Sequence, residues 1–335
     1  MEDTMKKALL VIGTALIVAA TAASQTQELT VYTGRGKGLV DPLVQAYQAE
    51  SGVKVNVRYG TDAQLLAAVQ EEGARSPADI FWANTSGSLG LLSKNNQFVK
   101  LSTAITNKPN LYVPESKTWT PLSIRFRVLA YNPAKIKAAD LPTSVMDLPK
   151  MTALKGRVGW TPAYASFQDF VGAMAATKGD AVTSQWLAGM KQLEPKAYGT
   201  NNVQMLEALR AGEIDVALTN HYYVLRFTKV GYAMGTHYFQ NGDLGSLALV
   251  TGAGILKTSK KSVTAQRFLT WLLSSKAQQF FSGEIFEYPV VKGAILPSSL
   301  LPLNDMINRS PKIDFDKLAD YVDNAQKLLR EQGLL

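Results

Sequence analysis

The sequence predicts an α/β protein made of two lobes that face each other across a cleft. The chain has 335 residues and no cysteine, and roughly 310 residues remain after an export signal, which is enough for two lobes. Strand-like and helix-like patterns alternate from the first of these residues. The same alternation returns after the middle of the chain, so both halves predict a mostly parallel sheet covered by helices.

In the first half, short apolar or alternating runs predict strands, and the amphipathic stretches between them predict helices. The predicted strands are 29–32, 53–57 and 78–82, and the predicted helices are about 39–50 and about 62–72, with Asp62 as the N-cap of the second helix. A glycine-rich turn, 33–38, separates the first strand from the first helix. This order of elements is typical of βαβ units.

In the second half, the predicted strands are 157–160 and 214–219, and the predicted helices are 167–178 and 181–192. The chain has no low-complexity segment or long linker, so the two lobes must be joined by strands that cross between them. We expect 124–131 and 248–256 to be these strands. The predicted first lobe is 24–125 plus about 253–303, and the predicted second lobe is about 126–252 plus 304–335.

The N-terminus has the parts of a secretory signal peptide. Lys6 and Lys7 precede an apolar run, 9–20, and small residues follow at 21–24. The apolar run is shorter than the roughly 20 residues that a membrane-spanning helix needs. The sequence therefore predicts a signal peptide at 1–23 and a mature protein in the periplasm, without a lipid anchor because no cysteine is present.

Composition and motifs disfavour several classes of function. The net charge is +8, but the basic residues are scattered and form no stripe with aromatic residues, which argues against nucleic acid as a partner. The sequence contains no phosphate-binding loop, dinucleotide fingerprint or nucleophile elbow. The two histidines, His221 and His237, lack the spacing of a zinc site. We therefore expect a binding protein rather than an enzyme, and we expect it to be a monomer.

The candidate binding residues follow predicted strands. Ligands of open α/β sheets bind beyond the carboxyl ends of the strands. The polar and aromatic residues at such places are 33–36, Asn84, Tyr164 and 220–223. These residues come from four separate parts of the chain, so we expect them to meet in the cleft between the lobes.

Tyr222 and Tyr223 are the most distinctive of these residues. Two consecutive side chains can point to one place only where the backbone turns, and this pair lies between a predicted strand and a helix that is predicted to run to about Lys229. The pair could supply two phenolate ligands, or it could pack as two aromatic rings at the start of the helix. Composition and spacing leave both interpretations open.

Several phrases of the chain resemble those of the bacterial ferric-ion-binding proteins of ABC-type iron importers. They occur in the order and spacing of that family, and they are 31–35, 71–73 with 76–81, 125–132, 159–167, 208–223 and 287–289. The resemblance covers the mature chain. It implies a type II periplasmic-binding-protein fold that closes on Fe³⁺, and it implies an ABC importer permease in the inner membrane as the partner.

The resemblance also implies a set of iron ligands. Tyr222 and Tyr223 fall on the family's paired iron-ligating tyrosines, which favours the phenolate interpretation. Many members also use a histidine and a glutamate, but this chain has Gly36 and Asn84 at those positions. Tyr164 stands where those members have a phosphate-binding serine, as in the branch that uses three tyrosines and a carbonate.

Three phenolates with a small anion suit the chemistry of Fe³⁺, which is a hard cation that prefers oxygen donors. A coordinated phenol loses its proton, so three phenolates would neutralise Fe³⁺, and carbonate or bicarbonate would complete the octahedral shell. Arg125 matches the arginine that the family places near the anion, Asn201 matches another anion-site position, and Arg35 lies in the turn after the first strand. A planar guanidinium suits a planar oxyanion, although either arginine could instead form a salt bridge.

Two alternatives stay open at this point. The chain could be a related binding protein for thiamine, a polyamine or an oxyanion, with the tyrosines stacking on the solute or bonding to it. It could also be an exported enzyme, which the lack of a recognisable nucleophile and base disfavours. Colour separates iron binding from both, because Fe³⁺ phenolates absorb visible light.

Overall fold

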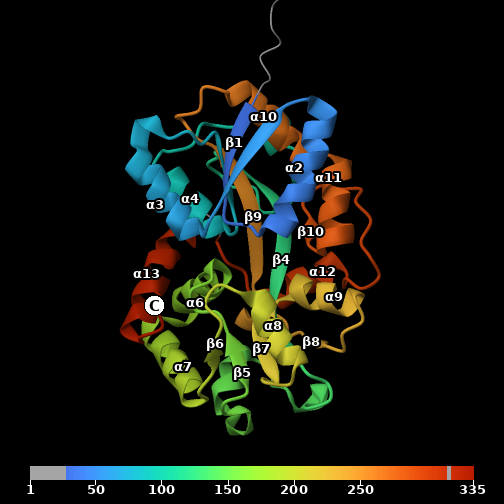
Figure 1. Cartoon of the computed structure of the whole chain (residues 1–335). Coiled ribbons are helices and arrows are strands. Elements are labelled where there is room, and N and C mark those ends of the chain that lie inside the picture. The colour runs from blue at the N-terminus through green and yellow to red at the C-terminus, as the bar shows by residue number, and fades with distance from the viewer. Residues whose placement is uncertain (1–27, 315–317) are drawn as a thin grey trace, which may run out of the picture.

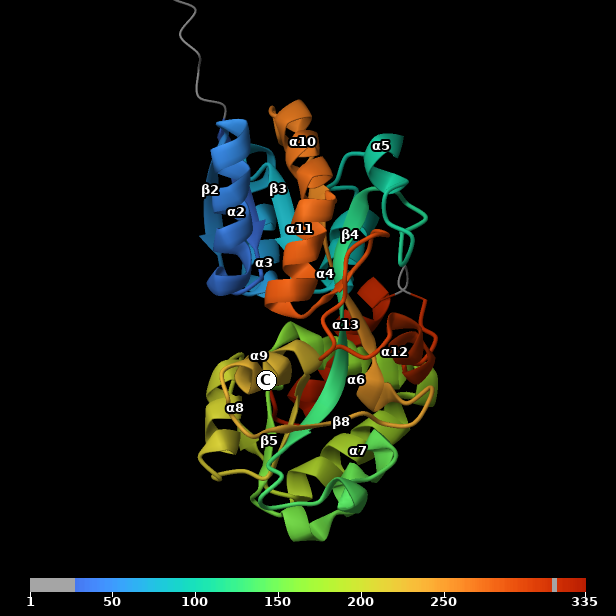
Figure 2. The same ribbon diagram turned by 90° about the vertical axis from the view of Figure 1, so that its right-hand side faces the viewer.

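The computed structural model describes residues 28–314 and 318–335 of the chain. They form two lobes, one above the other in Figure 1, with two long strands passing between them. These are β4 (Trp119–Tyr131) and β9 (Ala248–Ile255), and Figure 2 shows them from the side. The two crossing strands lie where the sequence predicts them. The predicted signal peptide, 1–23, lies outside the described residues.

The strands of both lobes follow one path in the order β2-β1-β3-β9-β4-β7-β5-β6. Off this path, β10 pairs with the middle of β4, at Ser123 and Ile124, and β8 pairs with the end of β4, at 129–131. The strands of the upper lobe are β1 (Glu28–Thr33), β2 (Lys54–Tyr59), β3 (Ile80–Ala83) and β10 (Tyr288–Pro289). Those of the lower lobe are β5 (Val158–Trp160), β6 (Lys196–Ala197), β7 (Val216–Asn220) and β8 (Gly235–His237). The pairs β1–β2, β1–β3, β5–β7 and β5–β6 are parallel, as expected for βαβ units.

The strand β4 changes partner in the middle of its length. Its first part, up to Phe126, pairs with β9, and its last part, from Arg127, pairs with β7. Because alternate side chains of a strand share a face, Arg125 and Arg127 lie on the same face of β4 at this crossing point.

Helices cover the sheet in each lobe. The helices of the upper lobe are α2 (Lys37–Ser51), α3 (Asp62–Glu72), α4 (Ser86–Lys94), α5 (Thr103–Thr106), α10 (Ser262–Leu272) and α11 (Ser275–Phe280). Those of the lower lobe are α6 (Ala165–Lys178), α7 (Asp180–Gln192), α8 (Asn202–Arg210) and α9 (His221–Lys229). Two further helices follow, α12 (Leu303–Arg309) and α13 (Leu318–Glu331). In Figure 1, α13 lies beside both α4 and α6.

The predicted cap of α3 is wrong by one residue. Thr61 is the N-cap, and its hydroxyl accepts from the backbone N–H of Gln64 while the Gln64 side chain accepts from the N–H of Thr61. This is a capping box. Asp62 is instead buried and accepts hydrogen bonds from the backbone N–H groups of Asn84 and Thr85.

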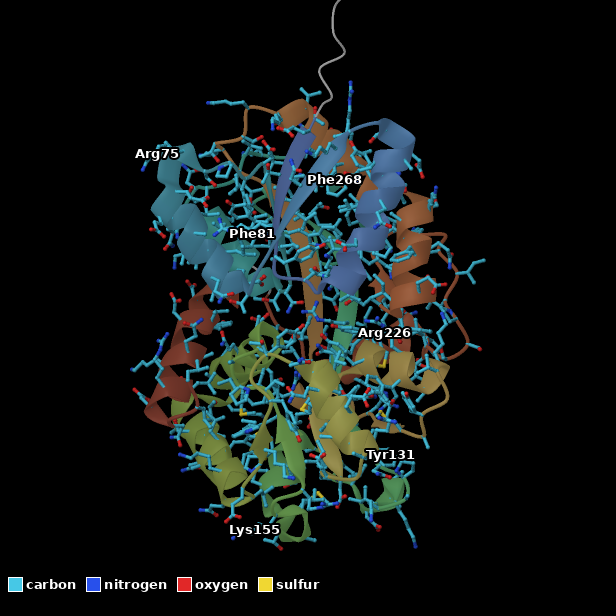
Figure 3. All side chains as sticks on the ribbon, viewed as in Figure 1. Arg75, Phe81, Tyr131, Lys155, Arg226 and Phe268 are labelled. Atoms are coloured by element: carbon cyan, nitrogen blue, oxygen red, sulfur yellow. The ribbon has the colours of Figure 1, made fainter. Side chains whose placement is uncertain are left out.

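Each lobe has an aromatic core that takes the place of cross-links in a chain without cysteine. In the upper lobe the ring of Trp82 packs edge-on against Phe268, which Figure 3 labels, and against Phe281. In the lower lobe Phe167 packs edge-on against Trp160, and Phe170 packs in the same way against Trp186. Aromatic pairs of this kind add to the stability that burial alone provides.

The lobe boundaries that the sequence suggests stay a prediction. Within the described part of the chain, no helix combines the length and the apolar character needed to cross a membrane.

Candidate metal and anion site

A cavity of about 470 Å³ opens between the two lobes. It lies beyond the carboxyl ends of β1, β2, β3 and β5, where the sequence places the candidate residues. Its lining includes Gly34, Arg35, Gly36, Lys37, Tyr59, Asn84, Tyr164, Thr200 and Tyr223. Segments that are far apart in the sequence therefore meet at one cleft.

The structure brings two of the three predicted tyrosine ligands into direct contact. The phenol oxygens of Tyr164 and Tyr223 are 3.3 Å apart, and the Tyr164 hydroxyl lies 3.4 Å from the Asn84 side-chain oxygen, to which it donates. Tyr164 precedes α6, and Tyr223 lies in the first turn of α9. The Asn84 contact connects the lower lobe to the upper one.

Tyr222 lies beside Tyr223, with ring centroids 4.2 Å apart in a stacked arrangement. The helix α9 begins at His221, directly after β7, so both tyrosines lie where the backbone turns from strand to helix. Tyr222 is fully buried, and its hydroxyl has no hydrogen-bond partner within residues 28–314 and 318–335. The sequence-based geometry of this pair is confirmed.

Burial raises the pKa of both phenols well above the ordinary value, and the negative charge that Tyr164 would carry raises the pKa of each further. Without a bound cation, Tyr222 and Tyr223 are therefore neutral phenols. A cation that binds their oxygens must displace the protons.

Arg125 is fully buried and touches both lobes from the crossing strand. Its Nη2 donates to the backbone oxygen of Asn84 at 2.5 Å and to the hydroxyl of Ser166 at 3.1 Å. Its Nε and Nη1 atoms have no partner among the residues that the structure describes. Part of this guanidinium is thus left for another acceptor.

Arg35 lines the cavity, but its charge is already compensated. Its Nη1 and Nη2 atoms donate to the two carboxylate oxygens of Glu287 at 3.0 and 3.1 Å, and both side chains are fully buried. Ser123 also donates to Glu287. Burial alone would lower the pKa of Arg35, but Glu287 outweighs it and the pKa is raised. Arg35 therefore forms the salt bridge that was the alternative to anion binding. The binding of an anion by Arg35 stays a prediction.

Asn201 is exposed and caps α8, because its side-chain oxygen accepts from the backbone N–H of Gln204 at 3.0 Å. The neighbouring Thr200 lines the cavity. The anion role of Asn201 stays a prediction, with only its amide nitrogen uncommitted to the cap.

Both histidines have hydrogen-bond partners. His221 is buried, accepts from the N–H of Phe126 through Nδ1 and lies 2.8 Å from the Phe286 oxygen through Nε2. Burial lowers the pKa of His221 to about 4. The Nε2 atom of His237 lies 2.8 Å from the Pro142 oxygen. In the described part of the chain, no group of three or more His, Cys, Asp or Glu is arranged to hold a metal ion.

Two charged residues near the cavity escaped the sequence analysis. Arg127 is buried over the rings of Phe167 and Phe170, at 5.6 and 5.4 Å, and its two Nη atoms are unpartnered within the described residues. Burial lowers the pKa of Arg127 to about 9. The alternation of Arg125 and Arg127 on one predicted strand could have revealed it. The second charged residue is Asp169, and nothing in the sequence around this acid on α6 indicates a functional role.

The family described as bacterial extracellular solute-binding protein matches residues 29–284. This chain belongs to that family. Its members bind solutes, and the resemblance stated from the sequence is confirmed.

Individual relatives of this solute-binding protein match over almost the whole chain. It is 34% identical to a Serratia marcescens protein named Fe(3+)-binding periplasmic protein, over 98% of this chain and 97% of that one. It is 31% identical to the major ferric iron-binding protein of Neisseria meningitidis serogroup B, over 100% of both.

Solved structures confirm the fold. The structure of iron-bound HitA from Pseudomonas aeruginosa matches with a TM-score of 0.86 and 35% identity, over 92% of this chain and 100% of that one. A Trichodesmium protein in complex with iron and citrate matches with a TM-score of 0.74 and 25% identity, over 92% and 100%. The predicted two-lobed periplasmic-binding fold is therefore correct.

Proposed function

We propose that this solute-binding protein captures Fe³⁺ in the periplasm and delivers it to the permease of an ABC importer. Support comes from the relatives, whose names state that they bind ferric iron, and from the tyrosines at the cleft. Its role is to bind and release iron rather than to catalyse a reaction. The export signal expected at 1–23 fits this location.

The phenolate oxygens of Tyr164, Tyr222 and Tyr223 are the proposed iron ligands. The observation that carries this proposal is the 3.3 Å separation of the Tyr164 and Tyr223 oxygens, with Tyr222 stacked on Tyr223. Hard oxygen donors match Fe³⁺, and adjacent oxygens can share one ion once their protons have left. Because burial favours the neutral phenols, iron binding must release protons, so the affinity rises with pH.

The proposed anion is carbonate or bicarbonate, held by Arg125. The Nε and Nη1 atoms of Arg125 have no partner among the described residues, so each can still donate a hydrogen bond to an oxyanion. Three phenolates balance the charge of Fe³⁺, so the negative charge of the anion needs a cation nearby. Arg35 and Asn201 remain the other proposed anion contacts, although Glu287 already occupies much of Arg35.

The test is a competition for Fe³⁺ between the metal-free protein and a soluble chelator, with bicarbonate, with citrate and with neither anion. Replacing Tyr223→Phe should weaken iron binding by more than about 100-fold, because loss of a ligand costs more than loss of an outer partner. Tyr59→Phe is the matched control, since Tyr59 lines the same cavity but donates its hydroxyl to Asp41. Equal losses in the two variants would contradict the ligand assignment. Tight iron binding with citrate and without bicarbonate would identify citrate, and not carbonate, as the anion.

A further inference from the structure

Asp169 is a buried acid that the proposed iron site does not use. It lies on α6 of the lower lobe and is 1% exposed. Its Oδ2 atom has no hydrogen-bond partner in the part of the chain described here. A buried carboxyl that lacks partners destabilises a protein unless its surroundings compensate, so its position calls for an explanation.

The carboxyl of Asp169 reaches the upper lobe at the start of α4. A Cβ atom placed on Gly87, the second residue of α4, would lie 3.1 Å from the Asp169 Oδ1 atom. The Thr85 side chain, at the N-cap of α4, hydrogen-bonds to Asp169. The atom nearest to that Cβ would be Cγ2 of Val322 on α13, at 2.5 Å, so α13 is the main reason for glycine at 87 and the Asp169 carboxyl is a second close neighbour.

This contact matches the chemistry of a helix start. The first N–H groups of a helix lack intrahelical partners, and an acceptor beside them is favourable. Among the described residues, the side chain of Thr85 makes no capping bond to α4 itself. Asp169 on a helix of the lower lobe therefore places a carboxyl group beside the start of a helix of the upper lobe, where it hydrogen-bonds to the N-cap side chain.

Three other charged groups face this contact from the elements packed around it. Arg125 of β4 attracts the carboxylate, and Asp62 of α3 repels it. Asp323 of α13 and Asp169 both line a second cavity, which is distinct from the one at the tyrosines and has a volume of about 220 Å³. Burial, and then Asp62, raise the pKa of Asp169 to about 7, against the opposing effects of Arg125 and Thr85.

We propose that Asp169 is a positioning residue that latches the two lobes in the closed state, by docking its carboxyl on the N-terminus of α4 across the cleft. The latch lies beside the iron site, on the α4, α6 and α13 side of the molecule in Figure 1. This proposal rests on the proposed iron capture in one respect, because closing the lobes would shield the tyrosine ligands from solvent.

The latch couples closing to a proton. When the lobes open, solvent reaches Asp169 and its pKa returns toward the ordinary value of about 4. The closed state, with a pKa of about 7, therefore binds more protons than the open state between these two values. The contribution of Asp169 to closing is fully present below about pH 4 and weakens as the pH rises to about 7.

Three variants distinguish the docking of the Asp169 side chain from the protonation of its carboxyl. Asp169→Ala removes the docking group, so the lobes should be more open than in the parent at pH 5, and the difference should shrink at pH 8. Asp169→Asn keeps the shape and mimics the protonated carboxyl, so it should close at pH 8 as the parent does at pH 5. Gly87→Ala leaves Asp169 unchanged but places a methyl group 3.1 Å from its Oδ1 and 2.5 Å from Val322, so it should also open the lobes. Asp323→Asn is the control.

The measurements are the radius of gyration by small-angle X-ray scattering, with and without iron, at pH 5 and pH 8, and the rate at which iron leaves to a competing chelator. For Asp169→Ala at pH 5 we expect a larger radius and up to roughly tenfold faster iron loss, the upper end of what the loss of one neutral hydrogen bond produces. The iron-loaded spectrum should stay that of the parent, because the ligands are untouched.

The latch would be overturned if the control, Asp323→Asn, had the same radius and the same iron-loss rate as Asp169→Ala and Gly87→Ala. A radius of the iron-free Asp169→Asn protein that still changes between pH 5 and pH 8 would also overturn it. A changed iron spectrum in Asp169→Ala would assign the residue to the metal site instead. The scattering of the iron-free protein tests the latch even if the parent binds no iron, so the two proposals can fail separately.

Discussion

Two buried arginine regions meet at the crossing of the lobes, and they differ in how their charge is used. Arg35 forms a two-pronged ion pair with Glu287, and Ser123 adds a further hydrogen bond to that carboxylate. Arg125 and Arg127 lie on one face of β4, and together they have four unpartnered guanidinium nitrogens within the described residues. No salt bridge joins either of them to a carboxylate in that part of the chain.

The difference separates a structural charge from a charge kept for a ligand. A buried ion pair holds together the elements that supply its partners, here the turn after β1 and the segment before β10. A buried guanidinium without a carboxylate adds nothing comparable to the fold, but it is ready to receive an anion. We therefore expect substitutions in the Glu287 region to affect stability, and substitutions at Arg125 to affect iron binding.

The largest effect should come from Glu287→Gln, which leaves the charge of Arg35 buried and unpaired. Such a change costs about 3–5 kcal/mol of the free energy of unfolding, to be measured by urea denaturation. Glu284→Gln is the control, because its ion pair with Lys229 is exposed and contributes little. Similar losses in both variants would contradict the structural role of the Glu287 pair.

His221 adds a pH dependence to the Glu287 region, where it contacts the backbone of Phe286. Its pKa is about 4 in the folded protein and about 6.5 in the unfolded chain. The unfolded chain binds more protons between these values, so stability falls by about 3 kcal/mol as the pH falls from 6.5 to 4. Asp169, with its raised pKa, contributes the opposite slope.

The measurement is therefore a difference between the parent and His221→Gln. We expect the variant to lose less stability on acidification than the parent, whatever its stability at pH 7. His237→Gln should follow the parent more closely, because His237 is only partly buried. Parallel stability curves for the parent and His221→Gln would show that His221 is not held neutral by burial.

Arg125→Gln should weaken iron binding in bicarbonate by about 10–100-fold, the range found when groups that support a metal site are lost. Its effect on the free energy of unfolding should be smaller than that of Glu287→Gln. In buffer free of bicarbonate and citrate, the parent and the variant should bind iron more equally. If Arg125→Gln weakens iron binding equally with and without an anion, Arg125 does not act by holding the anion.

The smallest effect should come from Arg127→Met. The flexible apolar side chain can pack on Phe167 and Phe170, and replacing a buried charge by an apolar group of similar size is often neutral. We expect a change in the free energy of unfolding within about 1 kcal/mol, from the same urea titrations. A loss as large as that of Glu287→Gln would abolish the contrast between the two regions.

Local patterns predicted the parts of the molecule that depend on neighbouring residues. The crossing strands, the turn from β7 into α9 and the position of Tyr164 after β5 follow from periodicity, and the structure confirms them. The cap of α3 was misplaced because Thr61 and Asp62 both have a capping side chain, and only the fold shows that Asp62 is occupied by Asn84 and Thr85.

Contacts between distant residues could not be predicted in this way. Glu287 lies 252 residues after Arg35, and neither residue shows in its own surroundings that the other will neutralise it. The same holds for Asp169, whose partners Thr85 and Gly87 belong to the other lobe. Such pairings depend on how the lobes meet, and one sequence gives no pattern for that.

The most direct test of the account is the visible spectrum of the mature protein, stripped of metal and reloaded with Fe³⁺ in bicarbonate. It should be recorded for the parent, Tyr164→Phe and Tyr222→Phe. The parent should be coloured, because Fe³⁺ phenolates absorb visible light, and its band should be shifted or lost in both variants. A colourless parent, or variants with the parent's band, would contradict the three-phenolate site.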